Sequence, residues 1–99
     1  MHVVALSIDL HLPQVHSLKE KRSVIRPMLE GCRHRFGVAA AEVDYQERWQ
    51  RAELGFSVVS STRSHAVDVM DRVERFIWSF PEAEVLSAER HWLEESRAR

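Results

Sequence analysis

A short basic segment, His16–Arg22 (HSLKEKR), holds the residues of this chain that are best suited to bind an anion. Lys19, Lys21 and Arg22 follow a serine in the position of a helix cap, so the three cations lie in the first turns of the expected helix. A helix N-terminus has unpaired amides and partial positive charge, which attract phosphate. Arg26 lies one turn later and adds a guanidinium that can bind phosphate bidentately. The segment therefore predicts a nucleic-acid phosphate site formed by Lys19, Lys21, Arg22 and Arg26.

A solvated basic surface without any ligand is the alternative interpretation of this segment. Glu20 would then screen Lys19 and Lys21, and the long side chains would cover apolar surface. The pattern alone favours this second interpretation, because most charged helix faces are simply solvated. Both interpretations stay open at this point.

The connector ERWQRAE, Glu47–Glu53, gives a second candidate patch. Trp49 could stack on a base while Arg48 and Arg51 hold phosphates. The alternative is structural: Trp49 folds over the end of the core, and Arg51 covers its ring by a cation–π contact. The structural alternative is favoured here, because a small domain often needs one large apolar anchor in a connector.

Catalytic and metal chemistry find little support in the sequence. Asp9, His11 and His16 could ligate zinc, but His16 lies beyond a turn and no Cys/His pair has ligand spacing, so no metal site is expected. Cys32 lies on the apolar stripe of a helix, which indicates a buried thiol and not a nucleophile. No phosphate-binding glycine loop is present, and we expect neither an enzyme nor a cofactor.

The bulk properties fit one domain over residues 1–99, with a frayed tail at about 94–99. The chain has 99 residues, 44% of them hydrophobic, and a formal net charge of −1. Residues 1–37 nevertheless contain six Lys or Arg and only three acids, so the basic charge is concentrated there. No apolar run is long enough to cross a membrane. A single cysteine indicates a reducing, cytoplasmic environment.

Hydrophobic periodicity predicts six elements. Residues 2–12 alternate as a strand, and a helix follows from a capping box at Ser17 and Glu20, in which the Glu20 carboxylate accepts from the Ser17 amide. This helix reaches Phe36, is kinked at Pro27 and has two stripes, one apolar and one basic. A weaker strand is expected at 38–45 and a stronger one at 52–61. A helix is expected from Thr62 or Ser64 towards Pro81, and a last strand at about 83–93.

This order predicts an α+β, ferredoxin-like βαββαβ fold, in which two helices pack on one face of a four-stranded antiparallel sheet. The other face is left open and carries small or polar residues, namely Ala5, Ser7, Asp9, His11, Gly55, Ser57 and Val59. Without an aromatic residue, this face is unsuited to stacking bases as an RRM does. It is equally suited to sheet-to-sheet dimerisation.

The segments HSLKEKRSVIRPMLEGCRHRFGVAAAEVD and WQRAELGFSVVS resemble the YlxP-like family of small bacterial proteins, a domain of unknown function. The resemblance extends from His2 to about Leu93; Gly37 departs from it, since asparagine is common there. The resemblance implies the ferredoxin-like fold. It also implies a connection to ribosomal RNA or a ribosomal subunit, since the family's genes often lie among translation and ribosome-maturation genes. No catalytic residues are established for the family.

Two functions follow as expectations. In the first, the chain is a cytoplasmic, non-catalytic bacterial protein that contacts ribosomal RNA or a ribosomal subunit through the basic helix. In the second, it is a homodimeric or protein-docking module that uses the open sheet face and has no nucleic-acid role.

Overall fold

The computed structural model describes residues 1–93, and its six elements follow the predicted order. The frayed tail expected at 94–99 lies outside the described residues. The elements are β1 (His2–His11), α1 (Leu18–Phe36), β2 (Ala39–Asp44), β3 (Arg51–Ser60), α2 (Arg63–Trp78) and β4 (Glu84–Trp92).

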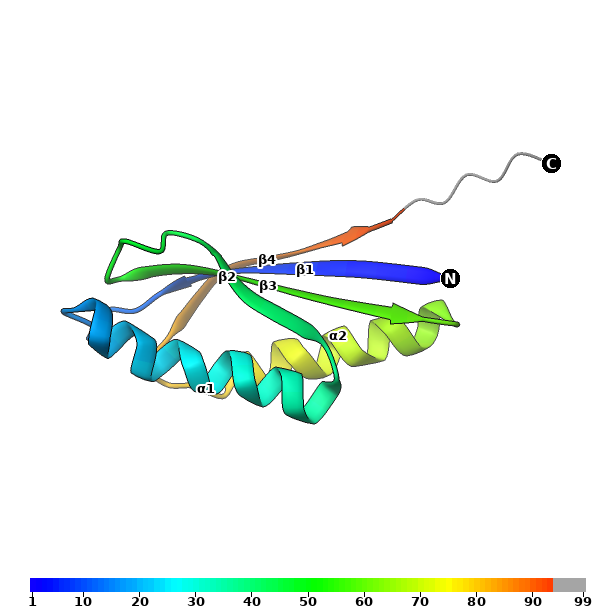
Figure 1. Ribbon diagram of the computed structural model, residues 1–99, viewed down its shortest axis with the longest axis horizontal. Helices are drawn as coiled ribbons and strands as arrows, with labels where there is room; N and C mark the ends of the chain where they lie inside the picture. Colours follow the sequence, from blue (N-terminus) through cyan, green and yellow to red (C-terminus); the bar gives the residue numbers. More distant parts are fainter. Residues whose placement is uncertain (94–99) are drawn as a thin grey trace.

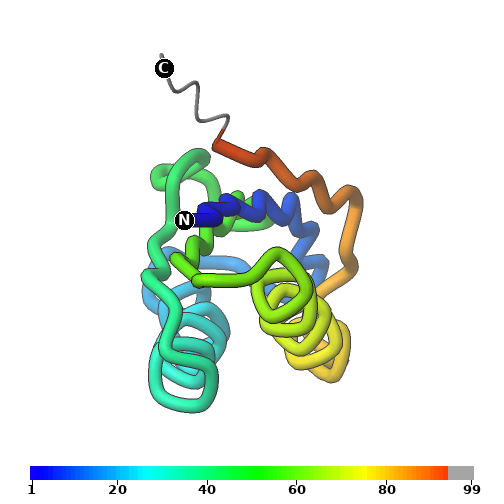
Figure 2. Tube along the Cα trace, turned by 90° about the vertical axis from the view of Figure 1, so that its right-hand side faces the viewer, coloured from blue at the N-terminus to red at the C-terminus, as the bar shows by residue number. Residues whose placement is uncertain are grey.

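The four strands form one antiparallel sheet in the order β2-β3-β1-β4. Both helices cover the same face of this sheet, and no helix formed by residues 1–93 lies on its other face (Figures 1 and 2). The fold is therefore the ferredoxin-like α+β fold that the order of elements predicted. The two central strands are β1 and β3, so β2 and β4 form the edges.

The core lies between the sheet and the helices and follows from the alternation of each strand. In β1 the side chains of Val4, Leu6, Ile8 and Leu10 are at most 1% exposed, because every second residue points to the helices. The helices contribute apolar stripes at helical spacing. Their buried members are Ile25, Met28 and Cys32 in α1 and Ala66, Val69, Met70, Val73 and Ile77 in α2.

The ends of α1 are fixed as the sequence predicted, with one difference. Ser17 is the N-cap and its Oγ accepts from the Glu20 amide at 3.0 Å. The Glu20 carboxylate accepts from the His16 amide at 2.9 Å and not from Ser17, so this half of the capping-box prediction is wrong. The reason is that the Glu20 side chain extends past the N-cap to the residue that precedes it. At the other end Gly37 adopts φ 66°, the left-handed conformation that glycine tolerates.

The helix α1 is continuous from Leu18 to Phe36, although it contains Pro27. Pro27 lies on the exposed side, where solvent can satisfy the carbonyl that loses its partner. The second helix is capped by Thr62, whose hydroxyl accepts from the His65 amide at 3.3 Å. Within residues 1–93, neither helix has both the length and the apolar character that a membrane crossing needs.

Candidate nucleic-acid interface

Three cations of α1 lie together on its solvent-exposed face. Lys19, Arg22 and Arg26 are all exposed and follow one another at spacings of three and four residues, which places them on one side of a helix. They line a hollow of about 480 Å³ that is completed by Ser23, Pro27 and Glu30. We call Lys19, Arg22 and Arg26 the basic stripe.

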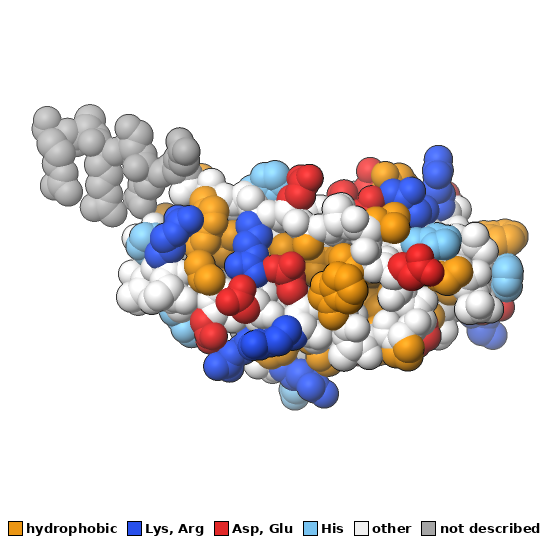
Figure 3. Space-filling view, turned by 180° about the vertical axis from the view of Figure 1, so that it is seen from behind, with side chains coloured by type: hydrophobic (Ala, Val, Ile, Leu, Met, Phe, Trp, Pro, Cys, Tyr) orange, Lys and Arg blue, Asp and Glu red, His pale blue; other side chains and the backbone are white. Residues whose placement is uncertain are grey.

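The part of the chain that the structure describes forms no ion pair with the basic stripe, although Glu30 lines the same hollow. Within residues 1–93, the ion pairs made by lysine or arginine involve Lys21, Arg51, Arg72 and Arg90, and none involves the stripe. The opposite side of the molecule, formed by α2 and β4, is different. Its blue and red side chains lie next to one another (Figure 3), as in the pair of Arg90 with Asp71 at 2.8 Å.

Two further contacts define the surroundings of the basic stripe. Glu20 is engaged by the His16 amide, so its carboxylate serves the helix entry. Arg33, which continues the basic face towards the end of α1, donates a hydrogen bond to the carbonyl of Ala40 at the start of β2. Its guanidinium is thus anchored to the sheet edge, and the stripe itself remains limited to the first half of the helix.

Lys21 does not belong to the exposed surface, contrary to the predicted phosphate site. Its side chain is 2% exposed and points between α1 and β2. The Nζ atom donates a hydrogen bond to the carbonyl of Tyr45 at 2.6 Å and lies 2.6 Å from a Glu42 carboxylate oxygen as an ion pair. The sequence could not place Lys21 here, because the partners are more than 20 positions away and the phase of α1 relative to β2 depends on tertiary packing.

The hairpin between β2 and β3 carries the second candidate patch, and its geometry contradicts the structural alternative that the sequence favoured. Trp49 is 51% exposed, so it does not fold over the core as the structural alternative expected. The ring under the arginines is Tyr45: the Arg51 guanidinium lies 4.7 Å and that of Arg48 5.6 Å from its centroid. Sequence reasoning missed Tyr45, and no signal marked it except its place at the end of a strand.

Arg51 is held by a carboxylate as well as by Tyr45. Its guanidinium donates to both oxygens of Asp9, at 3.3 and 2.7 Å, across the β1–β3 pair. The hydrogen bond to Asp9 raises the pKa of the Arg51 guanidinium. Arg51 therefore ties the hairpin to β1, whereas Arg48 and Trp49 remain exposed at its tip.

The two candidate patches lie at the same end of the molecule. Figure 1 shows the start of α1 and the hairpin between β2 and β3 at one end of the sheet. Between them is a small cavity of about 210 Å³, lined by Leu18, Lys21, Arg22, Glu42, Gln46 and Glu47. The exposed surface from Lys19 to the hairpin tip thus includes Lys19, Arg22 and Arg48, with the acid Glu47 between the two patches.

The residues considered for a metal site are engaged in other contacts. Within residues 1–93 there is no group of three or more His, Cys, Asp or Glu that could hold a metal ion. Asp9 is occupied by Arg51, and His11 lies 3.2 Å from the carboxylate of Glu84. These residues therefore serve as cross-strand contacts.

The single cysteine gives a first testable prediction. Cys32 is 0% exposed, and burial raises the pKa of its thiol to about 12. The thiolate is the reactive form, so we expect the native protein to react with a maleimide at pH 8.5 far more slowly than the protein unfolded in urea. A mass shift measured over time distinguishes the two. Equal rates would show that the thiol is accessible in the native state.

Comparison with known proteins gives the family of the chain. The chain is a small ferredoxin-like module whose first helix presents an unneutralised basic face. Residues 3–90 match the family described as "Protein of unknown function (DUF503)", and the chain belongs to that family. It is also 41% identical over 76 residues to the "Uncharacterized protein YlxP" of Bacillus subtilis (strain 168), a match that covers 77% of this chain and 83% of that protein.

Proposed function

We propose that this protein is a non-catalytic RNA-binding module whose basic stripe contacts the phosphate backbone, with ribosomal RNA in a ribosomal subunit as its target. One observation carries the proposal: Lys19, Arg22 and Arg26 are exposed on one helix face, and within residues 1–93 they have no carboxylate partner. Unneutralised cations at a helix start raise the local positive potential, and a phosphate would relieve it.

The spacing of the basic stripe suits a backbone and not a single small anion. A helix rises about 1.5 Å per residue, so Lys19 and Arg26 are about 10 Å apart along the axis, enough for two or three neighbouring phosphates. The stripe has no aromatic residue, and phosphate contacts alone do not depend on the base sequence. Binding through it is therefore expected to depend on charge and shape.

The hairpin adds a secondary contact to the proposed interface. Trp49 is half-exposed and Arg48 lies next to it, which suits stacking on an unpaired base beside the bound backbone. Arg51 contributes less, because Asp9 and Tyr45 already occupy its guanidinium. Lys21 supports the interface by holding the hairpin against α1.

Cosedimentation with ribosomal subunits at two salt concentrations tests this proposal. Three phosphate contacts predict a fall in affinity of about 20- to 40-fold between 50 and 200 mM monovalent salt. A triple reversal, K19E/R22E/R26E, is expected to abolish this binding.

The matched control is the reversal R63E/R72E/R75E on α2, which changes the net charge by the same amount. This variant is expected to retain most of the binding, because α2 lies on the side where acids and bases alternate. Equal loss in both variants would show a response to net charge only. Undiminished binding by K19E/R22E/R26E, or no salt dependence, would refute the role of the basic stripe.

A further inference from the structure

The open face of the sheet is divided into a charged half and an uncharged half. Asp9, Arg51 and Glu53 lie towards the hairpin, where β1 ends and β3 begins. In the other half, the open-face residues of β1 and β3 are uncharged, namely Val3, Ala5, Ser7, Gly55, Ser57 and Val59. On the edge strand β4, His91 and Glu89 lie on the same face, because they pair with Ala5 and Ser7. The central strands of this half therefore resemble an interface core, and β4 adds a polar rim.

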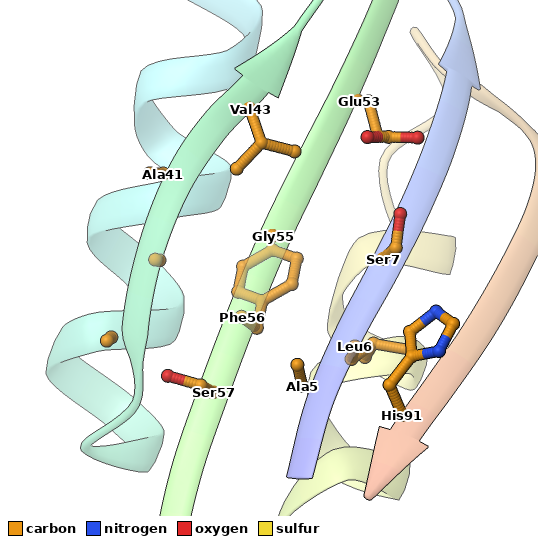
Figure 4. Close-up of a pocket in the computed structure, with 12 residues that line it drawn as sticks. Ala5, Leu6, Ser7, Ala41, Val43, Glu53, Gly55, Phe56, Ser57 and His91 are labelled. Carbon is orange, nitrogen blue, oxygen red and sulfur yellow. The ribbon is translucent and has the colours of Figure 1, made fainter. Parts of the chain in front are cut away.

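A shallow groove lies on this part of the face, and its lining also includes Glu53 and His91. The groove has a volume of about 440 Å³ and is floored by small residues, as Figure 4 shows for Ala5, Ser7, Gly55 and Ser57. Val43 of β2 is 50% exposed at one end, and Val59 of β3 is 65% exposed towards the other. Both valines add apolar area to this sheet face.

A bulge in the edge strand gives Val43 its position. The β2–β3 register shifts between Glu42 and Asp44, and Val43 is the residue in between. Its Cγ1 lies 2.9 Å from the place that a Cβ of Gly55 would take, so Val43 leans over the glycine. Gly55, which Val43 covers, thus lies two residues before Ser57 in β3, and the exposed Val59 lies two residues after it.

We propose that a second copy of this chain covers the uncharged half of the open face, about a two-fold axis that lies between the two sheets and passes Ser57. This axis is perpendicular to the strands, so the strands of the second copy run in the opposite direction. A residue that follows Ser57 in one protomer then faces the residue that precedes Ser57 by the same number of positions in its partner. Val59 of one protomer then packs on Gly55 and Val43 of its partner, and the same contact occurs twice. The surface is self-complementary, which is what a two-fold interface requires.

The interface area and the charges agree with this register. About seven residues of each central strand overlap, at about 3.3 Å per residue, across four strands about 4.8 Å apart. This gives about 440 Å² per protomer, so the dimer is expected at the low end of specific interfaces and to dissociate in the micromolar range. Asp9, Arg51 and Glu53 fall at or beyond the edge of the overlap, where they stay hydrated. Glu89 and His91 lie within its length but on the edge strand β4, where they form an ion pair at 3.8 Å on the rim of the interface.

The dimer is independent of the proposed RNA contact. The basic stripe lies on the helix layer, on the opposite side of the sheet, so both copies keep it exposed (Figure 2). Failure of either proposal leaves the other unaffected, because their variants share no residue.

Sedimentation equilibrium from 1 to 200 µM tests the dimer. We expect the wild type to approach twice its mass of 11.6 kDa at the upper concentrations. The variant V59E is expected to weaken association at least 100-fold and to remain monomeric throughout. The control W78E replaces an equally exposed side chain, 64% against 65%, on the helix side and should behave as the wild type. A wild type that stays monomeric at 200 µM overturns the proposal.

Cross-linking tests the register without a destabilising charge. The variant S57C brings two thiols to the axis, and a short bismaleimide should convert it to a covalent dimer. In S7C the two thiols are about 13 Å apart along the strands, because Ser7 pairs with Gly55, and little cross-linking is expected. Native Cys32 is buried and gives no background. Equal cross-linking of both variants, or a dimer that V59E leaves intact, would assign the interface to another surface.

Discussion

Replacing Lys21 with alanine is expected to lower the free energy of unfolding by about 3 kcal/mol, a far larger loss than at any exposed cation of the same helix. Its ammonium is removed from solvent, and both of its partners, Glu42 and the Tyr45 carbonyl, belong to the hairpin side of the sheet. Alanine leaves the Glu42 carboxylate without its counter-charge, and this carboxylate is itself only 23% exposed.

Thermal unfolding measures this effect. For a domain of about 100 residues, 3 kcal/mol corresponds to a decrease in Tm of about 15 °C. Lys19→Ala is the matched control, because Lys19 lies two positions away on the exposed side, and we expect a change within about 0.5 kcal/mol. Similar losses in the two variants would mean that Lys21 is not buried in solution.

A double variant separates the ion pair from the hydrogen bond. Lys21→Met with Glu42→Leu removes both charges and keeps most of the volume, and such replacements of buried pairs are often neutral. The Tyr45 carbonyl still loses its donor, so we expect a remaining deficit of about 1 kcal/mol. A double variant as unstable as Lys21→Ala would show that the loss comes from the ion pair and the Tyr45 hydrogen bond themselves, and not from an uncompensated charge on Glu42.

Lys21 also shows where sequence reasoning about the site stops. A helical pattern tells which residues share a face, and it predicted Ile25, Cys32 and either Met28 or Leu29 in the core, where the structure buries Ile25, Cys32 and Met28. Lys21 lies four positions before Ile25 and so shares this face, but its charge assigned it to the surface. Only the structure brings Glu42 of β2 within 2.6 Å, because the pair depends on how α1 crosses the sheet.

The segment SLKEKR changes in meaning once the structure is known. Ser17 and Glu20 hold the helix entry, and Lys21 holds the hairpin. Lys19 and Arg22 are the cations of this segment that are left to bind a ligand. Much of a motif that appears functional in sequence is thus required for the fold.

The hairpin was less predictable than the helices, because its conformation depends on side-chain contacts that no periodicity encodes. Tyr45 adopts φ 63°, which is uncommon for any residue other than glycine. Its carbonyl accepts from Lys21 and its ring lies under Arg51, so contacts on two sides hold this conformation. The alternation of β3 indicated the strand correctly, whereas the turn that leads into it had to be observed.

Gly31→Val is expected to destabilise the protein by about 3 kcal/mol through the contact between the two helices. A Cβ at this position would lie 2.5 Å from Cζ of Phe76 on α2, well inside the van der Waals distance. The ring cannot move away easily, because it packs edge-on against Phe36 and Phe80 and carries the Arg35 guanidinium 4.8 Å from its centroid. Overpacking of this kind costs about 1–3 kcal/mol, and valine brings two more methyl groups to the clash.

A double-mutant cycle with Phe76→Ala isolates this clash. Once the ring is removed, the valine at position 31 has room, and its helix propensity is slightly better than that of glycine. We therefore expect Gly31→Val to be neutral or stabilising by a few tenths of a kcal/mol in the Phe76→Ala background, as measured by urea unfolding. The coupling energy between the two positions should then be about 3 kcal/mol. A cost of Gly31→Val that is the same in both backgrounds would place its origin in the helix backbone and not in the packing of α1 on α2.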